Sequence, residues 1–357
     1  MRSLHGAPDP FLGEICGQPA ALRRAASRFP EDLAGLEAIH DRARLARTIV
    51  FTGMGSSYDA CYPAVNDLAG RGVPALLVDS AELLHFRRAI LGPETLLVIV
   101  SQSGESAEIV KLAKEIERQK RRPFLVSITN GTGNDLARAA DVRLDTTAGP
   151  ESGPSTVTFS AAMATLSGLA RLLAGDGVAT AVDRTRTAVE GTALAQERLL
   201  EDPEATAERL RAWHAGRSVT VALGRGPARA AAEMSALLLK ECGVMAESIE
   251  SGAFRHGPLE LAGPDMAAIV FATEPETRRL DLGLADDLVE AGSGVLVVTP
   301  DGEAPKGAEA SATGYLDRAL MSAAAIVPVQ LLAWGLARAA GRSPGVYTRA
   351  TKVTTRE

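Results

Sequence analysis

The chain contains few cysteines and few aromatic residues. Among its 357 residues there are three cysteines, Cys16, Cys61 and Cys242, and aromatic residues make up only 4% of the composition. The cysteines form neither a close pair nor a set with metal-ligand spacing, which argues against a disulfide framework and a cysteine-based metal site. Isolated cysteines are typical of a reducing compartment, so we expect structural thiols and a cytoplasmic protein. We expect no metal and no cofactor.

A signal peptide and a basic surface are also missing. Residues 1–20 lack the continuous apolar core that a signal peptide requires. The formal net charge is -6, and charges of both signs are mixed along the chain. This mixture argues against a nucleic-acid partner, because such a partner usually needs clustered basic residues.

Two uncharged stretches, residues 152–170 and 319–337, are long enough to cross a membrane. The first begins with a polar Ser-Gly-Pro-Ser turn, and the second contains Pro328 and Gln330. We therefore expect two buried helices packed against a sheet, and no membrane partner. Their similar positions, each late in its half of the chain, fit a repeated architecture.

The glycine pattern of a dinucleotide site is incomplete. Gly-x-Gly occurs at 53–55 and again at 224–226, each time after an apolar run. The third glycine of the dinucleotide fingerprint is replaced by Tyr58 in the first turn and by Arg229 in the second. Asp79 lies near the distance expected for a ribose-binding acid but is not decisive. Gly-x-Gly alone therefore does not predict a dinucleotide cofactor.

The most informative segment present is residues 96–106. An unbroken apolar run, 96–100, predicts a strand buried on both faces, and it ends in Ser-Gln-Ser-Gly-Glu-Ser before a helical pattern of apolar residues. The carboxyl end of such a strand is where parallel sheets bind ligands, and a helix N-terminus there favours an anion. The turn contains no Lys or Arg, so hydroxyl and amide groups would hold the anion, as suits a sugar phosphate. The alternative is an ordinary cluster of helix-capping serines.

Strand and helix patterns alternate in both halves, which predicts two α/β units with parallel sheets. We expect a helical lead-in over 1–35, a first unit over 36–178, a helical linker over 179–208, a second unit over 209–342 and a tail over 343–357. The predicted strands are 48–52, 75–78, 96–100, 124–128 and 142–144, then 219–223, 244–247, 267–271 and 295–298. The tail has no helical or strand period, and such tails are normally disordered.

Six short motifs occur in order along the chain. They are Gly-Ser-Ser-Tyr at 55–58, Ser-Gln-Ser-Gly-Glu-Ser at 101–106, Gly-Pro-Ser-Thr at 153–156, Leu-Lys-Glu at 239–241, His-Gly-Pro-Leu at 256–259 and Lys-Val-Thr at 352–354. Together they resemble the sugar isomerase (SIS) family, in particular the isomerase half of glucosamine-6-phosphate synthase and stand-alone glucosamine-6-phosphate deaminases of that fold. The resemblance covers about residues 40–357. It implies an α/β fold with two flavodoxin-like (SIS) domains, each a parallel sheet flanked by helices.

The resemblance also implies which residues bind the sugar phosphate. The positions that match the family's phosphate-binding residues are Ser56, Ser57, Ser101, Gln102, Ser103 and Ser106. Ser155 matches a further ligand-contacting position, with a one-residue gap in the local alignment.

Three further residues match catalytic positions of the family. Glu241 matches the acid/base that moves a proton between C1 and C2 of the open-chain sugar. His256 matches the residue associated with ring opening, which the family supplies across a dimer interface, and imidazole titrates near neutral pH as this task requires. Lys352 matches a tail lysine that contacts the sugar and can form a Schiff base when deprotonated. The rival histidine, His85, is interpreted as structural.

The resulting hypothesis is an amino-sugar-phosphate deaminase/isomerase that acts as a homodimer with shared active sites. Its expected reaction converts glucosamine 6-phosphate to fructose 6-phosphate and ammonia. The alternatives are a fructosamine-6-phosphate deglycase, a ketose/aldose phosphosugar isomerase and a sugar-phosphate-binding regulator. Regulators of this fold usually carry a helix-turn-helix domain, for which residues 1–40 are too short.

The chain departs from the synthase at several points. The sequence contains no amidotransferase half, and Leu238 and Val157 stand where the synthase has lysines. Glutamine-dependent synthesis is therefore not expected of this chain alone.

Overall fold

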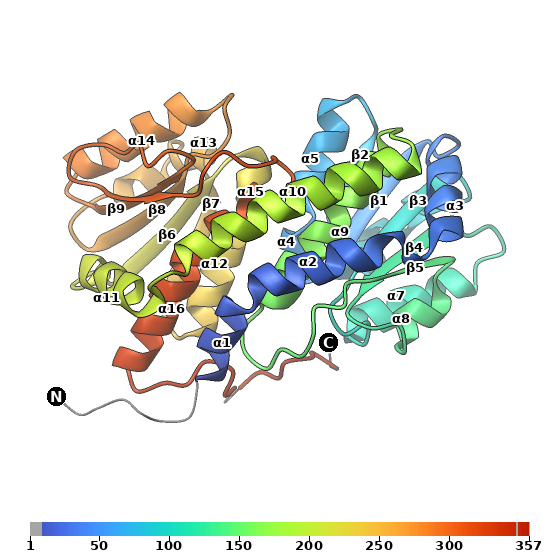
Figure 1. Cartoon of the computed structure of the whole chain (residues 1–357), viewed down its shortest axis with the longest axis horizontal. Coiled ribbons are helices and arrows are strands. Elements are labelled where there is room, and N and C mark those ends of the chain that lie inside the picture. Colours follow the sequence, from blue (N-terminus) through green and yellow to red (C-terminus); the bar gives the residue numbers. More distant parts are fainter. Residues whose placement is uncertain (1–8, 348, 357) are drawn as a thin grey trace.

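Two five-stranded parallel sheets form the centres of two lobes (Figure 1). The computed structural model describes residues 9–347 and 349–356. The first sheet has the order β2-β1-β3-β4-β5 and the second the order β10-β9-β8-β6-β7. Read from the other edge, the second sheet repeats the order of the first. This is the doubly wound, flavodoxin-like order, so the predicted α/β fold class of two flavodoxin-like domains is confirmed.

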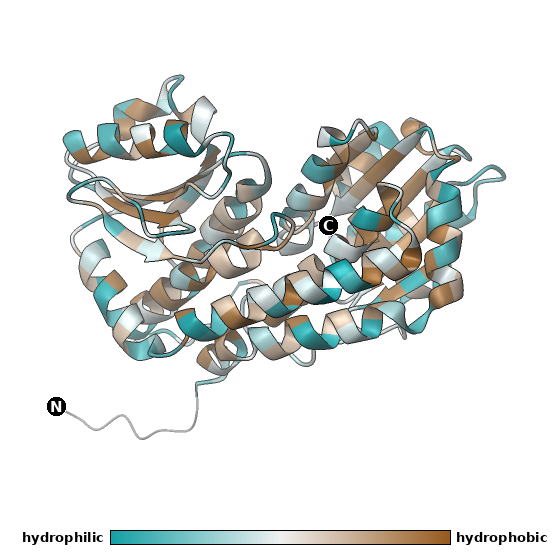
Figure 2. Cartoon of the chain, turned by 45° about the horizontal axis from the view of Figure 1, so that its top comes forward, coloured by the Kyte–Doolittle hydropathy of each residue, from teal (hydrophilic) through white to brown (hydrophobic). Residues whose placement is uncertain are grey.

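The apolar runs of the sequence form the strands. The first five are β1 (Thr48–Gly53), β2 (Ala75–Asp79), β3 (Thr95–Val100), β4 (Phe124–Thr129) and β5 (Val142–Asp145). The second five are β6 (Val219–Gly224), β7 (Ala246–Glu250), β8 (Met266–Phe271), β9 (Gly294–Thr299) and β10 (Glu309–Ala312). Every residue of β3, β8 and β9 is buried, as strands covered on both faces should be. Figure 2 shows these strands as hydrophobic ribbons inside the lobes.

One predicted strand needs correction, and one strand was not predicted. The strand predicted at 244–247 lies at Ala246–Glu250, where Thr220 to Gly224 of β6 pair with it in parallel. The edge strand β10 was not predicted, because its sequence Glu-Ala-Ser-Ala contains no apolar run and its residues stay partly exposed.

The helices flank the sheets and connect them. Those of the N-terminal region and first lobe are α1 (Pro10–Cys16), α2 (Gln18–Arg28), α3 (Leu33–Ala43), α4 (Ser56–Asp59), α5 (Tyr62–Gly70), α6 (Ser80–Glu82), α7 (Ala107–Glu117), α8 (Asp135–Ala139) and α9 (Val157–Leu173). Those that follow are α10 (Val178–Leu199), α11 (Pro203–His214), α12 (Arg229–Glu241), α13 (Ser251–Phe254), α14 (Arg278–Glu290), α15 (Met321–Ala325) and α16 (Val327–Ala339). Single turns η1 (Phe29–Glu31), η2 (Leu83–Arg87), η3 (Arg88–Ile90), η4 (Gly226–Ala228) and η5 (Pro258–Leu261) complete the set.

The two uncharged stretches form core helices. Every residue of α9 is buried, and α9 packs against α2, α5 and α10. Within the described residues, Met321–Ala339 is the one helical stretch that is long and apolar enough to cross a membrane, but 83% of its apolar window is buried inside the protein. The prediction of buried helices is therefore confirmed for both stretches.

The helical lead-in and the helical linker pack together in front of the sheets (Figure 1). The lead-in continues to the end of α3 at Ala43, beyond its predicted boundary, and the linker contains two helices, α10 and α11. Arg23 of α2 donates hydrogen bonds of 2.8 and 2.9 Å to Glu190 of α10. Gln18 of α2 donates to Gln330 of α16 at 2.7 Å in the buried core. These contacts make the N-terminal helices part of one core with both lobes.

Candidate functional site

Two serine turns follow adjacent strands of the first sheet. β1 pairs with β3 on one side and with β2 on the other, so the chain changes direction across the sheet at this point. Crevices at the carboxyl ends of strands beside such a switch point bind ligands in open α/β sheets. The turn after β1 holds Ser56 and Ser57, and the turn after β3 holds residues 101–106.

A cleft of about 1030 Å³ opens at this edge of the sheet. Its lining includes the seven residues predicted to bind the sugar phosphate, namely Ser56, Ser57, Ser101, Gln102, Ser103, Ser106 and Ser155. Glu241 and Lys352 line the same cleft, although they lie far from these serines in the sequence. The structure thus brings together nine of the ten predicted site residues, and their roles stay predictions.

Internal hydrogen bonds fix the serine turns. The Ser56 hydroxyl lies 2.9 Å from the Ser155 hydroxyl, which joins the turn after β1 to the loop after β5. The Ser101 hydroxyl accepts from the Gly104 backbone N–H at 3.1 Å. Gly104 has a φ of +66°, and a side chain there would collide with the Asn134 amide. Glycine is therefore required for this tight turn.

Glu241 is the last residue of α12 and carries the catalytic prediction. Glu241 lines the cleft and is exposed to solvent there, but the surrounding protein partly desolvates its carboxyl group. This partial desolvation raises the pKa of Glu241 to about 7, with the nearby Lys352 charge opposing the rise and the Glu151 charge adding to it. A carboxyl group with a pKa near neutrality can both take and return a proton at physiological pH.

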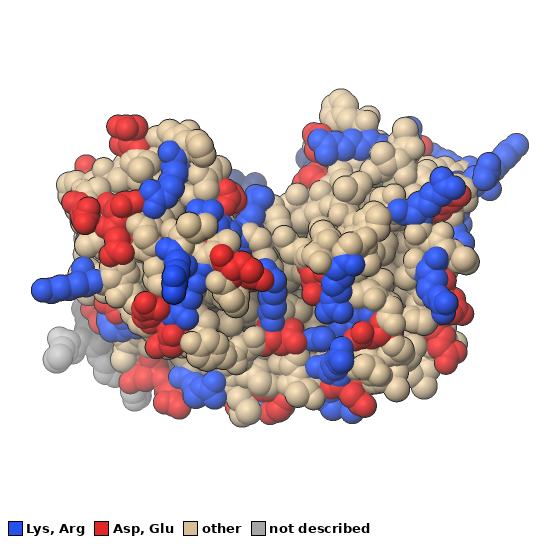
Figure 3. Space-filling model, turned by 90° about the horizontal axis from the view of Figure 1, so that it is seen from above, with Lys and Arg blue, Asp and Glu red and all other residues tan. Residues whose placement is uncertain are grey.

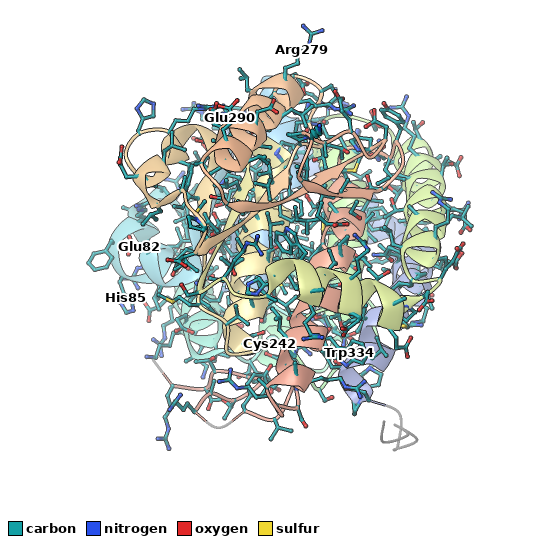
Figure 4. The ribbon with its side chains drawn as sticks, turned by 90° about the vertical axis from the view of Figure 1, so that its left-hand side faces the viewer. Glu82, His85, Cys242, Arg279, Glu290 and Trp334 are labelled. Carbon is teal, nitrogen blue, oxygen red and sulfur yellow. The ribbon has the colours of Figure 1, made fainter. Side chains whose placement is uncertain are left out.

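The tail lies along the cleft, and its described residues adopt neither helix nor strand. Gly345 crosses close to the backbone of Gly153, and its φ of +88° suits glycine. The Thr354 carbonyl accepts from the backbone N–H of Ala107 at 3.0 Å, at the first turn of α7. Figure 4 shows the tail ribbon passing below Cys242, the neighbour of Glu241. The tail therefore lines the same cleft as the serine turns and Glu241.

Sequence reasoning missed Glu151, which lies in the loop after β5. Its side chain is 0% exposed and forms an ion pair with Lys352, with Nζ 2.6 Å from Oε2. The available signal was an acidic residue in a Gly-Pro-rich turn after a predicted strand and before an apolar helix. That pattern predicts a loop at the ligand-binding edge of the sheet, but it does not indicate which basic residue pairs with the carboxylate.

Comparisons with known proteins agree with this geometry. A profile of the SIS domain matches residues 44–172 and 217–334, more than half of the chain. The chain belongs to the SIS domain family. It is 31% identical over 370 residues to the glutamine–fructose-6-phosphate aminotransferase (isomerizing) of Aeropyrum pernix, which covers 99% of this chain and 58% of that protein. The chain spans about half the length of the curated relatives that it matches.

Solved structures share the whole fold of this SIS protein. The C-terminal domain of glucosamine-fructose-6-phosphate aminotransferase from Francisella tularensis superposes with a TM-score of 0.85 at 21% identity, over 96% of this chain and 99% of that one. The tagatose-6-phosphate ketose/aldose isomerase of Escherichia coli gives a TM-score of 0.78 at 20% identity, over 94% and 95% of the two chains. These two likenesses establish the fold alone.

His256 does not line the cleft of its own SIS chain. It is exposed in the segment between α13 and η5, and its backbone N–H donates to the Ala253 carbonyl at 3.0 Å. The prediction that His256 acts across a dimer interface therefore stays a prediction. His85, the rival histidine, is exposed in η2 and also lies outside the cleft lining (Figure 4).

No cluster of three His, Cys, Asp or Glu side chains suited to a metal ion occurs among residues 9–347 and 349–356. Cys16, Cys61 and Cys242 are free thiols, as predicted. The face in Figure 3 carries basic and acidic side chains side by side, without a large region of one sign.

Proposed function

We propose that this SIS protein is an amino-sugar-phosphate deaminase/isomerase, with glucosamine 6-phosphate as its substrate. The observation that carries the proposal is the position of Glu241. Its carboxylate, with a pKa of about 7, shares one cleft with two hydroxyl-rich turns suited to a phosphate. A proton-transfer group and a phosphate site in one cleft are what isomerisation of a phosphorylated sugar needs.

The reaction proceeds in four steps. His256 of a second copy relays a proton from O1 to the ring oxygen and opens the ring. Glu241 removes the proton from C2, the C2–H electron pair forms a C1–C2 double bond, and the negative charge that develops on O1 is neutralised by a proton from water. Glu241 then returns its proton to C1 while the nitrogen lone pair forms a C2 iminium ion, which gives its N–H proton back to the hydroxide. Water adds to C2 of the resulting imine, ammonia leaves, and fructose 6-phosphate remains.

A deglycase is the second candidate, because the cleft is large. A volume of about 1030 Å³ lies at the upper end of sites for drug-sized ligands, which leaves room beside a hexose phosphate for an amine with a substituent. The same Glu241 proton transfer would run in the opposite direction, from C1 to C2 of a 6-phosphorylated fructosamine.

The deciding experiment measures product release from a panel of sugar phosphates. The panel contains glucosamine 6-phosphate, galactosamine 6-phosphate, fructosamine 6-phosphates and the unsubstituted hexose 6-phosphates. Ammonia and fructose 6-phosphate formed from glucosamine 6-phosphate would support the proposal. Release of a substituted amine identifies a deglycase, conversion of an unsubstituted sugar phosphate identifies an isomerase, and binding without turnover identifies a regulator.

The double substitution Ser101→Ala and Ser103→Ala is expected to raise KM sharply while the protein stays folded. Each hydrogen bond lost to a charged phosphate is worth roughly 1.5–3 kcal/mol. Steady-state kinetics and thermal unfolding measure the two effects. The matched control is Ser311→Ala in the edge strand β10, which does not line the cleft. A normal KM in the double variant would remove these serines from the phosphate site.

Subunit exchange tests the position of His256. Glu241→Gln and His256→Asn chains are each expected to be inactive, and mixing them should restore about a quarter of wild-type activity. The fraction follows from two-fold symmetry, since half of the exchanged dimers are mixed and each has one complete site of two. Native mass spectrometry verifies that exchange has occurred. Mixed dimers without activity would show that the site is not shared.

A further inference from the structure

The ion pair between Lys352 and Glu151 defines how the tail lysine is held. Nζ of Lys352 lies 2.6 Å from Glu151 Oε2 and 2.8 Å from the Gly153 carbonyl oxygen. Both partners are acceptors, so the nitrogen donates in both contacts. An ammonium group has three N–H donors, which leaves one for a ligand in the cleft.

The Glu151 carboxylate is held by hydrogen bonds from the start of α9. It accepts from the backbone N–H groups of Thr156 at 2.7 Å and Thr158 at 3.1 Å, and from the Thr158 hydroxyl at 2.6 Å. These donors form the first turn of the buried helix α9, whose N-terminus favours negative charge. These hydrogen bonds fix the Glu151 carboxylate in the position from which it contacts Lys352.

The loop that carries Glu151 is fixed from behind by the N-terminal helices. Glu14 of α1 accepts from the backbone N–H of Ser152 at 2.6 Å and from its hydroxyl at 2.8 Å. Arg24 of α2 donates to the Thr147 carbonyl at 3.0 Å. The loop thus holds Glu151 in a fixed position beside the tail.

We propose that Glu151 holds Lys352 as an ammonium ion facing the sugar, so that the tail lysine acts as a fixed cation and hydrogen-bond donor rather than as a Schiff-base nucleophile. This inference rests on the proposed function. Removal of the C2 proton by Glu241 pushes negative charge onto O1 of the sugar. A fixed ammonium beside Glu241 stabilises that charge without forming a covalent bond to the substrate. Glu151 is then a positioning residue that acts through Lys352.

The first test compares two substitutions of the lysine. Lys352→Met removes the charge and is expected to lower kcat by about 100-fold, as does loss of one oxyanion donor in other enzymes. Lys352→Arg keeps the charge and the donors but forms no Schiff base, and it should retain at least about ten times the kcat of Lys352→Met. Equal kcat values in the two variants would overturn the inference.

The second test needs no substrate turnover. Trace acetylation followed by peptide mass spectrometry compares the labelling rate of Lys352 with that of the exposed Lys306, because only the neutral amine reacts. Lys352 is expected to react several-fold more slowly than Lys306 in the wild type. Glu151→Gln should raise its rate several-fold, whereas Glu260→Gln, an exposed carboxylate that changes the net charge equally, should not. Thermal unfolding checks that both variants are folded.

The two tests separate the inference from the proposed function. If Lys352 is acetylated rapidly and Glu151→Gln does not change the rate, the inference is overturned, even if the enzyme is an active deaminase. A borohydride-reduced adduct between wild-type Lys352 and fructose 6-phosphate also overturns it. Slow, Glu151-dependent labelling in a protein that releases no ammonia from the panel supports the ammonium assignment and rejects the deaminase.

Discussion

Glu241→Gln is expected to lower kcat by about 10²–10⁴-fold, the range for loss of a general acid/base. Glutamine has almost the same shape as glutamate but does not take the C2 proton. The serine turns are untouched, so the affinity for the sugar phosphate should change little. The control is Glu290→Gln, an exposed carboxylate at the end of α14 (Figure 4). Near-normal kcat in Glu241→Gln would show that another group moves the proton.

The pH dependence follows from the same carboxyl group. The base acts only when ionised, and partial desolvation raises the pKa of Glu241 to about 7. Wild-type kcat/KM is therefore expected to fall about tenfold per pH unit below that value. The Lys352 charge lowers the pKa of Glu241. In Lys352→Met, the decrease of the residual kcat/KM at low pH should therefore begin at a higher pH than in the wild type. A wild-type kcat/KM that decreases only near pH 4.5 would contradict the assignment of Glu241 as the base.

The fold was predictable where one physical signal dominates. The sequences of β3 and β9 are continuous apolar runs, which is the pattern typical of strands buried on both faces. The edge strand β10 is held by its pairing with β9 rather than by apolar burial, so its sequence carries no such signal. The strand β7 was placed too early because its register depends on its pairing with β6.

The meeting of the two serine turns was predictable for a similar reason. Parallel strands carry their following turns to one edge, so the serine turns after β1 and β3 had to meet. The position of the tail was not predictable from its residue pattern. The tail is held by backbone contacts: Gly345 packs against Gly153, and the Thr354 carbonyl accepts a hydrogen bond from the Ala107 N–H. Backbone contacts of this kind produce no recognisable pattern of side chains in the sequence. Only the family resemblance around Lys352 indicated this position.

Deletion of residues 349–357 is expected to abolish turnover while shifting Tm by no more than a few degrees. The deletion removes Lys352 and opens the cleft, so the charge beside Glu241 is lost and water enters before the imine forms. Stability should change little because Arg349, Ala350 and Thr351 are exposed and add nothing to the core. Glu151 loses its ion pair but keeps its hydrogen bonds to the first turn of α9.

Lys352→Met should reproduce most of the defect of the deletion, since the lysine is the tail's charged group in the cleft. Thr355→Ala, at an exposed position of the same tail, is the matched control and should keep wild-type kcat. Steady-state kinetics and thermal unfolding on the three variants separate catalysis from folding. A normal kcat in the truncated enzyme would show that the tail is only a solvated end, and Lys352 would then no longer be assigned to the active site. A large fall in Tm would instead show that the tail stabilises the fold, since loss of activity would then follow from unfolding.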